Sequence, residues 1–192
     1  GAVNALKFEG DRVVAQNFDG SGLVRDIVHN LGFPLRRRRV LLLGAGGAAR
    51  GALPTLLAQQ PAQLLIVNRT ASKAYALADE FAAHGALAAA SYPELSASAA
   101  AFDIVINATS ASLRGELPPV RSSVFLPAGL AYELAYGRGL TPFLRLAQGT
   151  EVRHLADGVG MLVEQAAEAF AWWRGVRPDT RGVIKTLTVP LA

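Results

Sequence analysis

The segment Arg39–Leu53, RVLLLGAGGAARGAL, constrains the fold more than any other part of the chain. An apolar run ends at Gly44, further glycines follow at Gly46 and Gly47, and an alanine-rich segment of helical character begins at once. Glycine permits a tight turn without a Cβ in the way of a ligand, and a helix N-terminus offers free N–H groups and a positive dipole end. This context predicts a loop that binds the diphosphate of a dinucleotide. The alternative is a tight turn in an unrelated α/β protein.

Apolar runs alternate with helical segments along most of the chain. Near-continuous apolar runs are typical of parallel strands buried on both faces, and their alternation with helices indicates right-handed crossovers. Strands are expected at Val40–Gly44, Gln63–Asn68, Leu87–Ala90, Phe102–Asn107, Gly129–Leu134 and Glu151–His154. Helices are expected at Asp19–Gly32, Gly46–Gln59, Ala71–His84, Thr141–Gln148 and Asp157–Gly175, with a short one after Pro178. We therefore predict a Rossmann-like α/β fold, a doubly wound parallel sheet with helices on both faces.

Composition excludes several classes of protein. The 192 residues are 51% hydrophobic and 18% charged, which argues for a packed core, and no apolar run approaches the roughly 20 residues of a membrane span. The absence of cysteine fits a cytoplasmic location. The net charge of +4 and the run Arg36–Arg39 suggest nucleic-acid binding as one interpretation. No stacking aromatic residues accompany the run, so we expect it to be a solvated segment that leads into a strand. His29, His84 and His154 share no ligand spacing, so no metal is expected.

The N-terminal segment alternates polar and apolar residues around the turn signal Glu9–Asp11, which predicts a β-hairpin. A lone hairpin is marginally stable in water. We therefore expect the hairpin to belong to a sheet whose other strands lie outside these residues, and the chain to be a fragment of a longer protein.

The strand that follows the glycine loop ends in Asn68, Arg69 and Thr70, with Lys73 one turn later. A site specific for NAD has an acidic residue at about this position, which binds the ribose 2′-hydroxyl. A guanidinium instead binds a 2′-phosphate through paired hydrogen bonds. The sequence thus favours NADP over NAD; the alternative for Arg69 is a solvated surface arginine.

Two further stretches carry polar residues at the ends of elements. Asn107, Thr109 and Ser110 close a buried strand, where ligands of open α/β sheets bind; they could equally cap the next segment. Asp19 lies where the hairpin meets the first helix, either as an N-cap or as a polar group at a domain hinge. A lone aspartate is a poor general base near neutral pH, and no neighbouring Lys or His in sequence could assist it.

Taken together in this order and spacing, the motifs GAVNAL, NFDG, GAGGAARG, NRT, NATS, TPFL and ADGVGMLVEQAA resemble those of the shikimate dehydrogenase family. The resemblance covers essentially the whole chain. It implies the NADPH-dependent reduction of 3-dehydroshikimate to shikimate, on the pathway to aromatic amino acids. It also implies that Gly1–Phe18 is the tail of a substrate domain, Asp19–Asp157 the NADP domain, and Gly158–Ala192 helices that return to the largely absent substrate domain.

The same resemblance implies roles for individual residues. Asn4 and Asp19 would bind substrate hydroxyls, Asp19 being half of a catalytic Lys–Asp pair, and Gln165 would contact substrate. Tyr132 would lie near substrate and nicotinamide. The remaining cofactor contacts are Gly44, Ala45, Gly46, Gly47 and Ala48 to the diphosphate, Asn68, Arg69, Thr70 and Lys73 to the adenosine phosphate, and Gly158 and Met161 to the nicotinamide end.

The family's catalytic lysine lies in an N-terminal motif that these residues do not include, so this polypeptide alone is expected to bind NADP without turnover. Ala5, Phe18, Ser112 and Glu133 depart from the family's usual Thr, Thr, Gly and Asp. Two alternatives therefore stay open: a paralogue that acts on quinate or a related polyol acid, and a non-catalytic NADP-binding module. A homodimer is also open at this stage.

Overall fold

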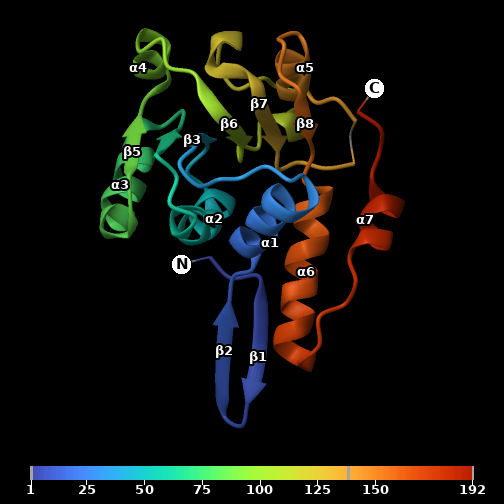
Figure 1. Cartoon of the computed structure of the whole chain (residues 1–192). Coiled ribbons are helices and arrows are strands. Elements are labelled where there is room, and N and C mark those ends of the chain that lie inside the picture. Colours follow the sequence, from blue (N-terminus) through green and yellow to red (C-terminus); the bar gives the residue numbers. More distant parts are fainter. Residues whose placement is uncertain (1, 138, 192) are drawn as a thin grey trace.

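The chain folds around a six-stranded, wholly parallel sheet. The computed structural model describes residues 2–137 and 139–191, and the strand order is β5-β4-β3-β6-β7-β8 (Figure 1). The strands are β3 (Arg39–Leu43), β4 (Gln63–Val67), β5 (Leu87–Ala90), β6 (Phe102–Asn107), β7 (Phe125–Glu133) and β8 (His154–Ala156). Every neighbouring pair runs parallel. The predicted doubly wound α/β fold is confirmed.

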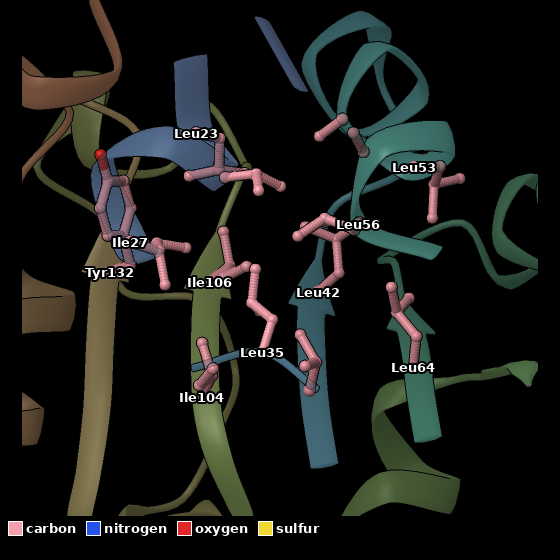
Figure 2. Packing of buried hydrophobic residues seen from close by; sticks show 14 of the residues in the cluster. Leu23, Ile27, Leu35, Leu42, Leu53, Leu56, Leu64, Ile104, Ile106 and Tyr132 are labelled. Atoms are coloured by element: carbon pink, nitrogen blue, oxygen red, sulfur yellow. The ribbon is translucent and has the colours of Figure 1, made fainter. Parts of the chain in front are cut away.

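Helices cover both faces of this sheet because its strands bury side chains on both. Alternate residues of a strand point to opposite faces, so Leu42 packs with the helices of one face and Leu41 with those of the other. Figure 2 shows the first core, in which Leu23 and Leu56 close over Leu42 and Ile106. The helices of this face are α1 (Asp19–Arg25), α2 (Gly47–Ala58) and α3 (Ala71–Phe81); those of the other are α4 (Tyr92–Ala97) and α5 (Pro142–Gln148).

The remaining elements lie on the side of α1. The hairpin of β1 (Ala5–Glu9) and β2 (Arg12–Gln16) extends away from the sheet, beside α6 (Val159–Arg174) (Figure 1). The indole of Trp173 in α6 donates a hydrogen bond of 2.9 Å to the carbonyl of Leu6 in β1. The other helices are η1 (Asp26–Asn30), a π-helix that continues α1, the 3₁₀ turns η2 (Ala82–His84), η3 (Ser112–Arg114) and η4 (Ser122–Val124), and α7 (Arg181–Leu187).

The structure differs from the expected elements in three places. The last strand covers His154–Ala156 instead of Glu151–His154, because the preceding residues form the turn after α5. β7 begins four residues before Gly129. Helix α4 was not predicted, although Ser91 and Glu94 form a capping box that is a readable start signal. Within residues 2–137 and 139–191, no helix is both long and apolar enough to cross a membrane.

Candidate active site

A cavity of about 440 Å³ lies at the carboxyl ends of β3, β4 and β6. Ligands of open parallel sheets bind at this edge, and the volume is typical of a small-molecule site. Its lining residues come from the glycine loop, the turn into α3, the start of α4 and the segment after β6. They are Gly44, Ala45, Gly46, Gly47, Ala48, Asn68, Arg69, Thr70, Lys73, Tyr92, Ala108, Thr109, Ser110, Ala111, Arg114, Glu116, Leu117, Pro118 and Pro119.

The glycines of the loop have two different structural roles. A Cβ built on Gly46 or Gly47 would have no heavy atom within 4 Å, so both backbones are open to a ligand at the N-terminus of α2. Gly44 is different, because its φ is +109° and a Cβ there would lie 2.8 Å from the carbonyl oxygen of Ala108. Gly44 therefore lets the loops after β3 and β6 approach each other, whereas Gly46 and Gly47 form the cradle that a diphosphate fits.

The turn into α3 supplies positive charge to the same cavity. Asn68 donates from its side chain to the carbonyl of Thr70, at 3.0 Å, which shapes the turn. Arg69 and Lys73 are exposed, and neither forms an ion pair within the described part of the chain. Two unpaired cations about one helical turn apart suit a phosphate monoester better than a ribose hydroxyl.

Asn107 takes the arrangement of the stated alternative, a cap on the segment after β6, and its cofactor contact stays a prediction. The residue is fully buried, and its side-chain amide donates to Glu133 at 2.9 Å and to Ser112 at 3.3 Å. Its oxygen accepts from the N–H and hydroxyl of Thr109, at 3.1 and 2.7 Å. Asn107 therefore shapes the wall of the cavity from behind, and Thr109 and Ser110 form the lining surface.

Glu133 is the buried hydrogen-bond acceptor that holds Asn107 in this wall. Its carboxylate also accepts from the hydroxyls of Ser112 and Thr141 and from the backbone of Ala135. Burial raises the pKa of Glu133, and the hydrogen bonds from Ser112 and Asn107 oppose that rise. Two of the departures from the family pattern, Ser112 and Glu133, thus contact each other, a pairing that sequence inspection missed because 20 residues separate them.

A second cluster of polar residues lies on the hairpin side of α2. The side-chain amide of Asn4 donates to Asp19 at 2.8 Å and to Gln165 at 3.3 Å, which joins the hairpin, α1 and α6. Asn17 donates to the same carboxylate at 3.5 Å, and its side chain lies against Gly51, one turn beyond the glycine loop in α2. Three of the four residues expected to bind substrate, all except Tyr132, therefore lie together, close to the start of α2.

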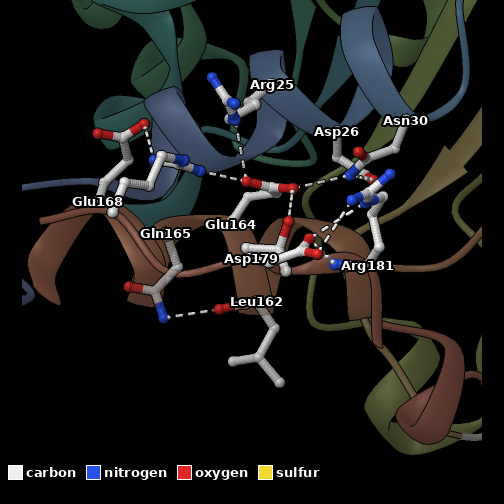
Figure 3. Close-up of polar contacts among 11 residues, drawn as sticks. Arg25, Asp26, Asn30, Leu162, Glu164, Gln165, Glu168, Asp179 and Arg181 are labelled. Carbon is white, nitrogen blue, oxygen red and sulfur yellow. Dashed lines mark hydrogen bonds and ion pairs between the residues drawn. The ribbon is translucent and has the colours of Figure 1, made fainter. Parts of the chain in front are cut away.

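A buried carboxylate in α6 fixes the helix that carries Gln165. Glu164, 1% exposed, pairs with Arg25 of α1 at 3.1 Å and with Arg177 beyond α6. It also accepts from Asn30 at 3.0 Å and Thr180 at 2.7 Å (Figure 3). Burial alone would raise the pKa of Glu164, but the hydrogen bonds from Asn30 and Thr180 and the charge of Arg177 outweigh it and lower the pKa.

Tyr132 has its side chain in the core, and the position near substrate and nicotinamide that was expected of it stays a prediction. Its hydroxyl donates to Asp26 at 2.7 Å and accepts from the backbone of Met161 at 3.3 Å, so it is fully buried and satisfied. Tyr136, three residues past β7 and half exposed, is the tyrosine at the ligand-binding edge of the sheet. Gly158 packs on Leu134 at the same edge, but neither Gly158 nor Met161 is among the residues lining the cavity, and their nicotinamide contacts stay a prediction.

The Arg36–Arg39 run is on the opposite edge of the sheet, and two of its residues, Arg38 and Arg39, contact β6. Arg38 forms an ion pair with Asp103 at 3.0 Å, and the backbone N–H of Arg39 donates to the same carboxylate at 2.8 Å. The Arg39 guanidinium lies 5.2 Å from the ring centre of Phe102. These contacts fasten the start of β3 to the start of β6.

Comparison with known proteins identifies two matching family models. The one described as "Shikimate / quinate 5-dehydrogenase" matches residues 26–114, and the one described as "Shikimate 5'-dehydrogenase C-terminal domain" matches residues 158–188. The first covers most of the cavity lining, from the glycine loop to Arg114.

Individual relatives agree over the whole chain. A shikimate dehydrogenase (NADP(+)) from Chromobacterium violaceum is 56% identical over 191 residues, which are 100% of this chain and 69% of that protein. The crystal structure of an Ael1 enzyme from Pseudomonas putida is 62% identical with a TM-score of 0.93, covering 100% of this chain and 69% of that one. Shikimate 5-dehydrogenase from Thermus thermophilus, solved with NADP(H) and shikimate, is 30% identical with a TM-score of 0.80, covering 97% and 67%. Since identity, fold and coverage all agree, the chain belongs to the shikimate dehydrogenase family.

Proposed function

We propose that the chain acts in an NADP-dependent oxidoreductase that interconverts 3-dehydroshikimate and shikimate. The observation that carries the proposal is the cavity at the sheet edge, which combines an open glycine cradle with the unpaired cations Arg69 and Lys73. The names of the relatives, which include NADP(+), and the Thermus structure with NADP(H) and shikimate support the same cofactor and substrate.

The residues fit NADP in distinct parts of the cavity. Gly46 and Gly47 would receive the diphosphate on free N–H groups, and Arg69 with Lys73 would receive the 2′-phosphate. When bound, the nicotinamide supplies or accepts the hydride at the substrate carbon. The chain's own contribution there is orientation of the substrate, for which we propose Asn4, Asp19 and Gln165; of these three, only Asp19 carries a group that can exchange a proton with the substrate hydroxyl.

The same assignment divides the chain functionally. We propose that residues 19–157 bind the cofactor, and that residues 2–18 and 158–191 face the substrate. Helix α1 lies at the junction, because it carries Asp19 at its start and packs against α2 on one side and α6 on the other. The homodimer and the cytoplasmic location stay predictions, the first testable by sedimentation equilibrium and the second by cell fractionation.

The 192-residue polypeptide by itself should bind NADP without oxidising shikimate. A proton transfer at the substrate oxygen needs a group whose pKa lies nearer to the working pH than that of an isolated Asp. The three lysines lie elsewhere: Lys7 pairs with Glu9, Lys73 lines the cofactor cavity, and Lys185 is in α7. Shikimate-dependent formation of NADPH by the purified polypeptide would contradict this part of the proposal.

Cofactor binding is tested by calorimetric titration of the polypeptide with NADP and with NAD. Arg69→Ala should weaken NADP binding about ten-fold and leave NAD binding within about two-fold, as expected for loss of one phosphate contact. Arg36→Ala is the matched control, since Arg36 is exposed at the opposite edge of the sheet. Equal losses for both cofactors, or no binding of NADP, would refute the assignment.

Quinate is the second candidate substrate, and the description of the matching family model includes it. Ala5 and Phe18 flank Asn4 and Asp19, where two departures from the family pattern occur. The backbone N–H of Phe18 donates to the Asn4 side chain at 2.9 Å, so Phe18 is part of the same cluster. Equilibrium binding of shikimate and quinate to the NADP-loaded polypeptide distinguishes the two; a preference for shikimate of less than about ten-fold, or 1.4 kcal/mol, would favour the broader specificity.

A further inference from the structure

One wall of the cofactor cavity carries an ion pair that belongs neither to the glycine loop nor to the turn that contains Arg69. Its members, Arg114 and Glu116, follow β6 and line the cavity. Glu116 is the only acidic residue among the described residues that line this cavity. A carboxylate is an unexpected group in a site that must accept phosphates, so its neighbours decide whether it interferes.

The chain holds this pair in one arrangement. Gly115, with φ +70°, separates the two residues and turns the backbone so that their side chains face each other. Arg114 donates from Nε to one Glu116 oxygen at 3.0 Å and from Nη2 to the other at 2.8 Å, a bidentate pair. Its Nη1 also donates to the hydroxyl of Ser110 at 3.2 Å. The backbone N–H of Glu116 donates to Ala111 at 3.0 Å, which fixes the other end.

Glu116 also interacts electrostatically with Arg69. The hydrogen bonds and charge of Arg114 lower the pKa of Glu116, and the charge of Arg69 lowers it further. The carboxylate is therefore ionised at neutral pH, and it lines the same cavity as Arg69. In the present arrangement both of its oxygens are occupied by Arg114, and Arg69 forms no ion pair with any described residue.

We propose that Arg114 is a specificity-determining positioning residue, which keeps Glu116 from pairing with Arg69 and so leaves Arg69 free for the 2′-phosphate of NADP. Without Arg114, the Glu116 carboxylate would compete with that phosphate for Arg69. NAD lacks the 2′-phosphate, so its binding would not suffer the competition. The proposal rests on the NADP binding proposed above.

The test is a two-residue cycle on the 192-residue polypeptide, with NADP and NAD affinities measured by calorimetry. Arg114→Ala should weaken NADP binding by about three- to ten-fold while NAD binding changes by less than about two-fold, the scale of one partly screened charge interaction. The double variant with Arg114→Ala and Glu116→Ala should return the NADP-to-NAD affinity ratio to that of the parent. Arg181→Ala is the matched control, because Arg181 forms the same bidentate pair with Asp179, two residues away, but lies outside the cavity.

Each other outcome counts against the proposal. An unchanged NADP-to-NAD affinity ratio in Arg114→Ala would overturn the proposal. A double variant whose affinity ratio stays as low as that of Arg114→Ala would also overturn it, because it would mean that Arg114 contacts the phosphate directly. A parent polypeptide that does not bind NADP would overturn the proposed function itself, and is recognised before any variant is made. Near-identical thermal unfolding of Arg114→Ala and Arg181→Ala checks that the lost ratio is not a folding defect.

Discussion

Replacing Gly44 with Ala should destabilise the fold, although the residue belongs to a loop expected to bind a ligand. Its φ of +109° is a backbone conformation that residues with a Cβ rarely adopt. In addition, the new Cβ would lie 2.8 Å from the carbonyl oxygen of Ala108 and 3.3 Å from the backbone nitrogen of Thr109. Neither neighbour is a flexible side chain, so relief requires a shift of the backbone that follows β6.

The size of the effect follows from these two terms. A residue held in an unfavourable backbone region costs about 1–3 kcal/mol, and overpacking of a rigid site costs a further 1–3 kcal/mol or so. We expect Gly44→Ala to lower the free energy of unfolding by about 2–5 kcal/mol, a large part of the roughly 5–15 kcal/mol of a typical domain. Because Ala108 and Thr109 also line the cavity, NADP binding should weaken as well.

The assay is urea unfolding followed by circular dichroism, paired with NADP titration, and Gly46→Ala is the matched control. A Cβ on Gly46 meets no protein atom within 4 Å, and its φ of −92° is ordinary for any residue. Gly46→Ala should therefore unfold within about 0.5 kcal/mol of the parent while still weakening NADP binding, since the methyl group enters the diphosphate cradle. If Gly44→Ala were as stable as Gly46→Ala, the reasoning that separates a structural glycine from a ligand-facing one would be refuted.

Three further predictions concern the polar contacts. Burial raises the pKa of Glu133, so the folded chain retains a proton that the unfolded chain releases. The contribution of Glu133 to the free energy of unfolding is therefore fully present below pH 4.5 and is lost as the pH rises. Glu133→Gln should therefore gain stability relative to the parent between pH 4.5 and 7 in urea unfolding, and a pH-independent difference would contradict this. Glu164→Gln should cost about 2 kcal/mol at pH 7 in the same assay, because it removes the charge that the hydrogen bonds from Arg25 and Arg177 stabilise, while both arginines are partly exposed and can turn to water. Because the pKa of Glu164 is lowered in the folded chain, this loss shrinks as the pH falls through and below 4.5. Trp173→Phe should speed hydrogen exchange in β1 and β2 by removing the bond to Leu6, worth about 1 kcal/mol, and unchanged exchange there would show that the indole does not hold the hairpin.

The elements that sequence predicted well are those fixed by local signals. The apolar runs of β3, β4 and β6 and the glycines between β3 and α2 need no distant partner to be recognised. The charge of Arg69 at the end of β4 is local in the same sense. The cavity therefore could be foreseen, because its walls are consecutive strand ends of one parallel sheet.

The features that the sequence did not reveal are side-chain contacts with partners distant in sequence. Asn107 is buried because Glu133, on the neighbouring strand, accepts from it, and nothing within Asn107's own segment indicates that partner. For Tyr132 a signal existed: it shares one face of β7 with Leu130, and both lie in the core on the α1 side, so its hydroxyl needed a buried partner, which is Asp26. The Asn4–Asp19–Gln165 cluster spans 161 residues, and only the resemblance to a family brought its members together.

The position of Asn4 links the orientation of the hairpin to the occupancy of the proposed substrate-binding cluster, Asn4, Asp19 and Gln165. Asn4 is paired to Gln16 through its backbone, at 3.0 Å, and to Asp19 and Gln165 through its side chain. A change in the hairpin's orientation must therefore alter the donors and acceptors presented to a bound hydroxy acid. If the ordered hairpin favours ligand binding by a given free energy, thermodynamic reciprocity requires that the bound ligand favour the ordered hairpin by the same free energy.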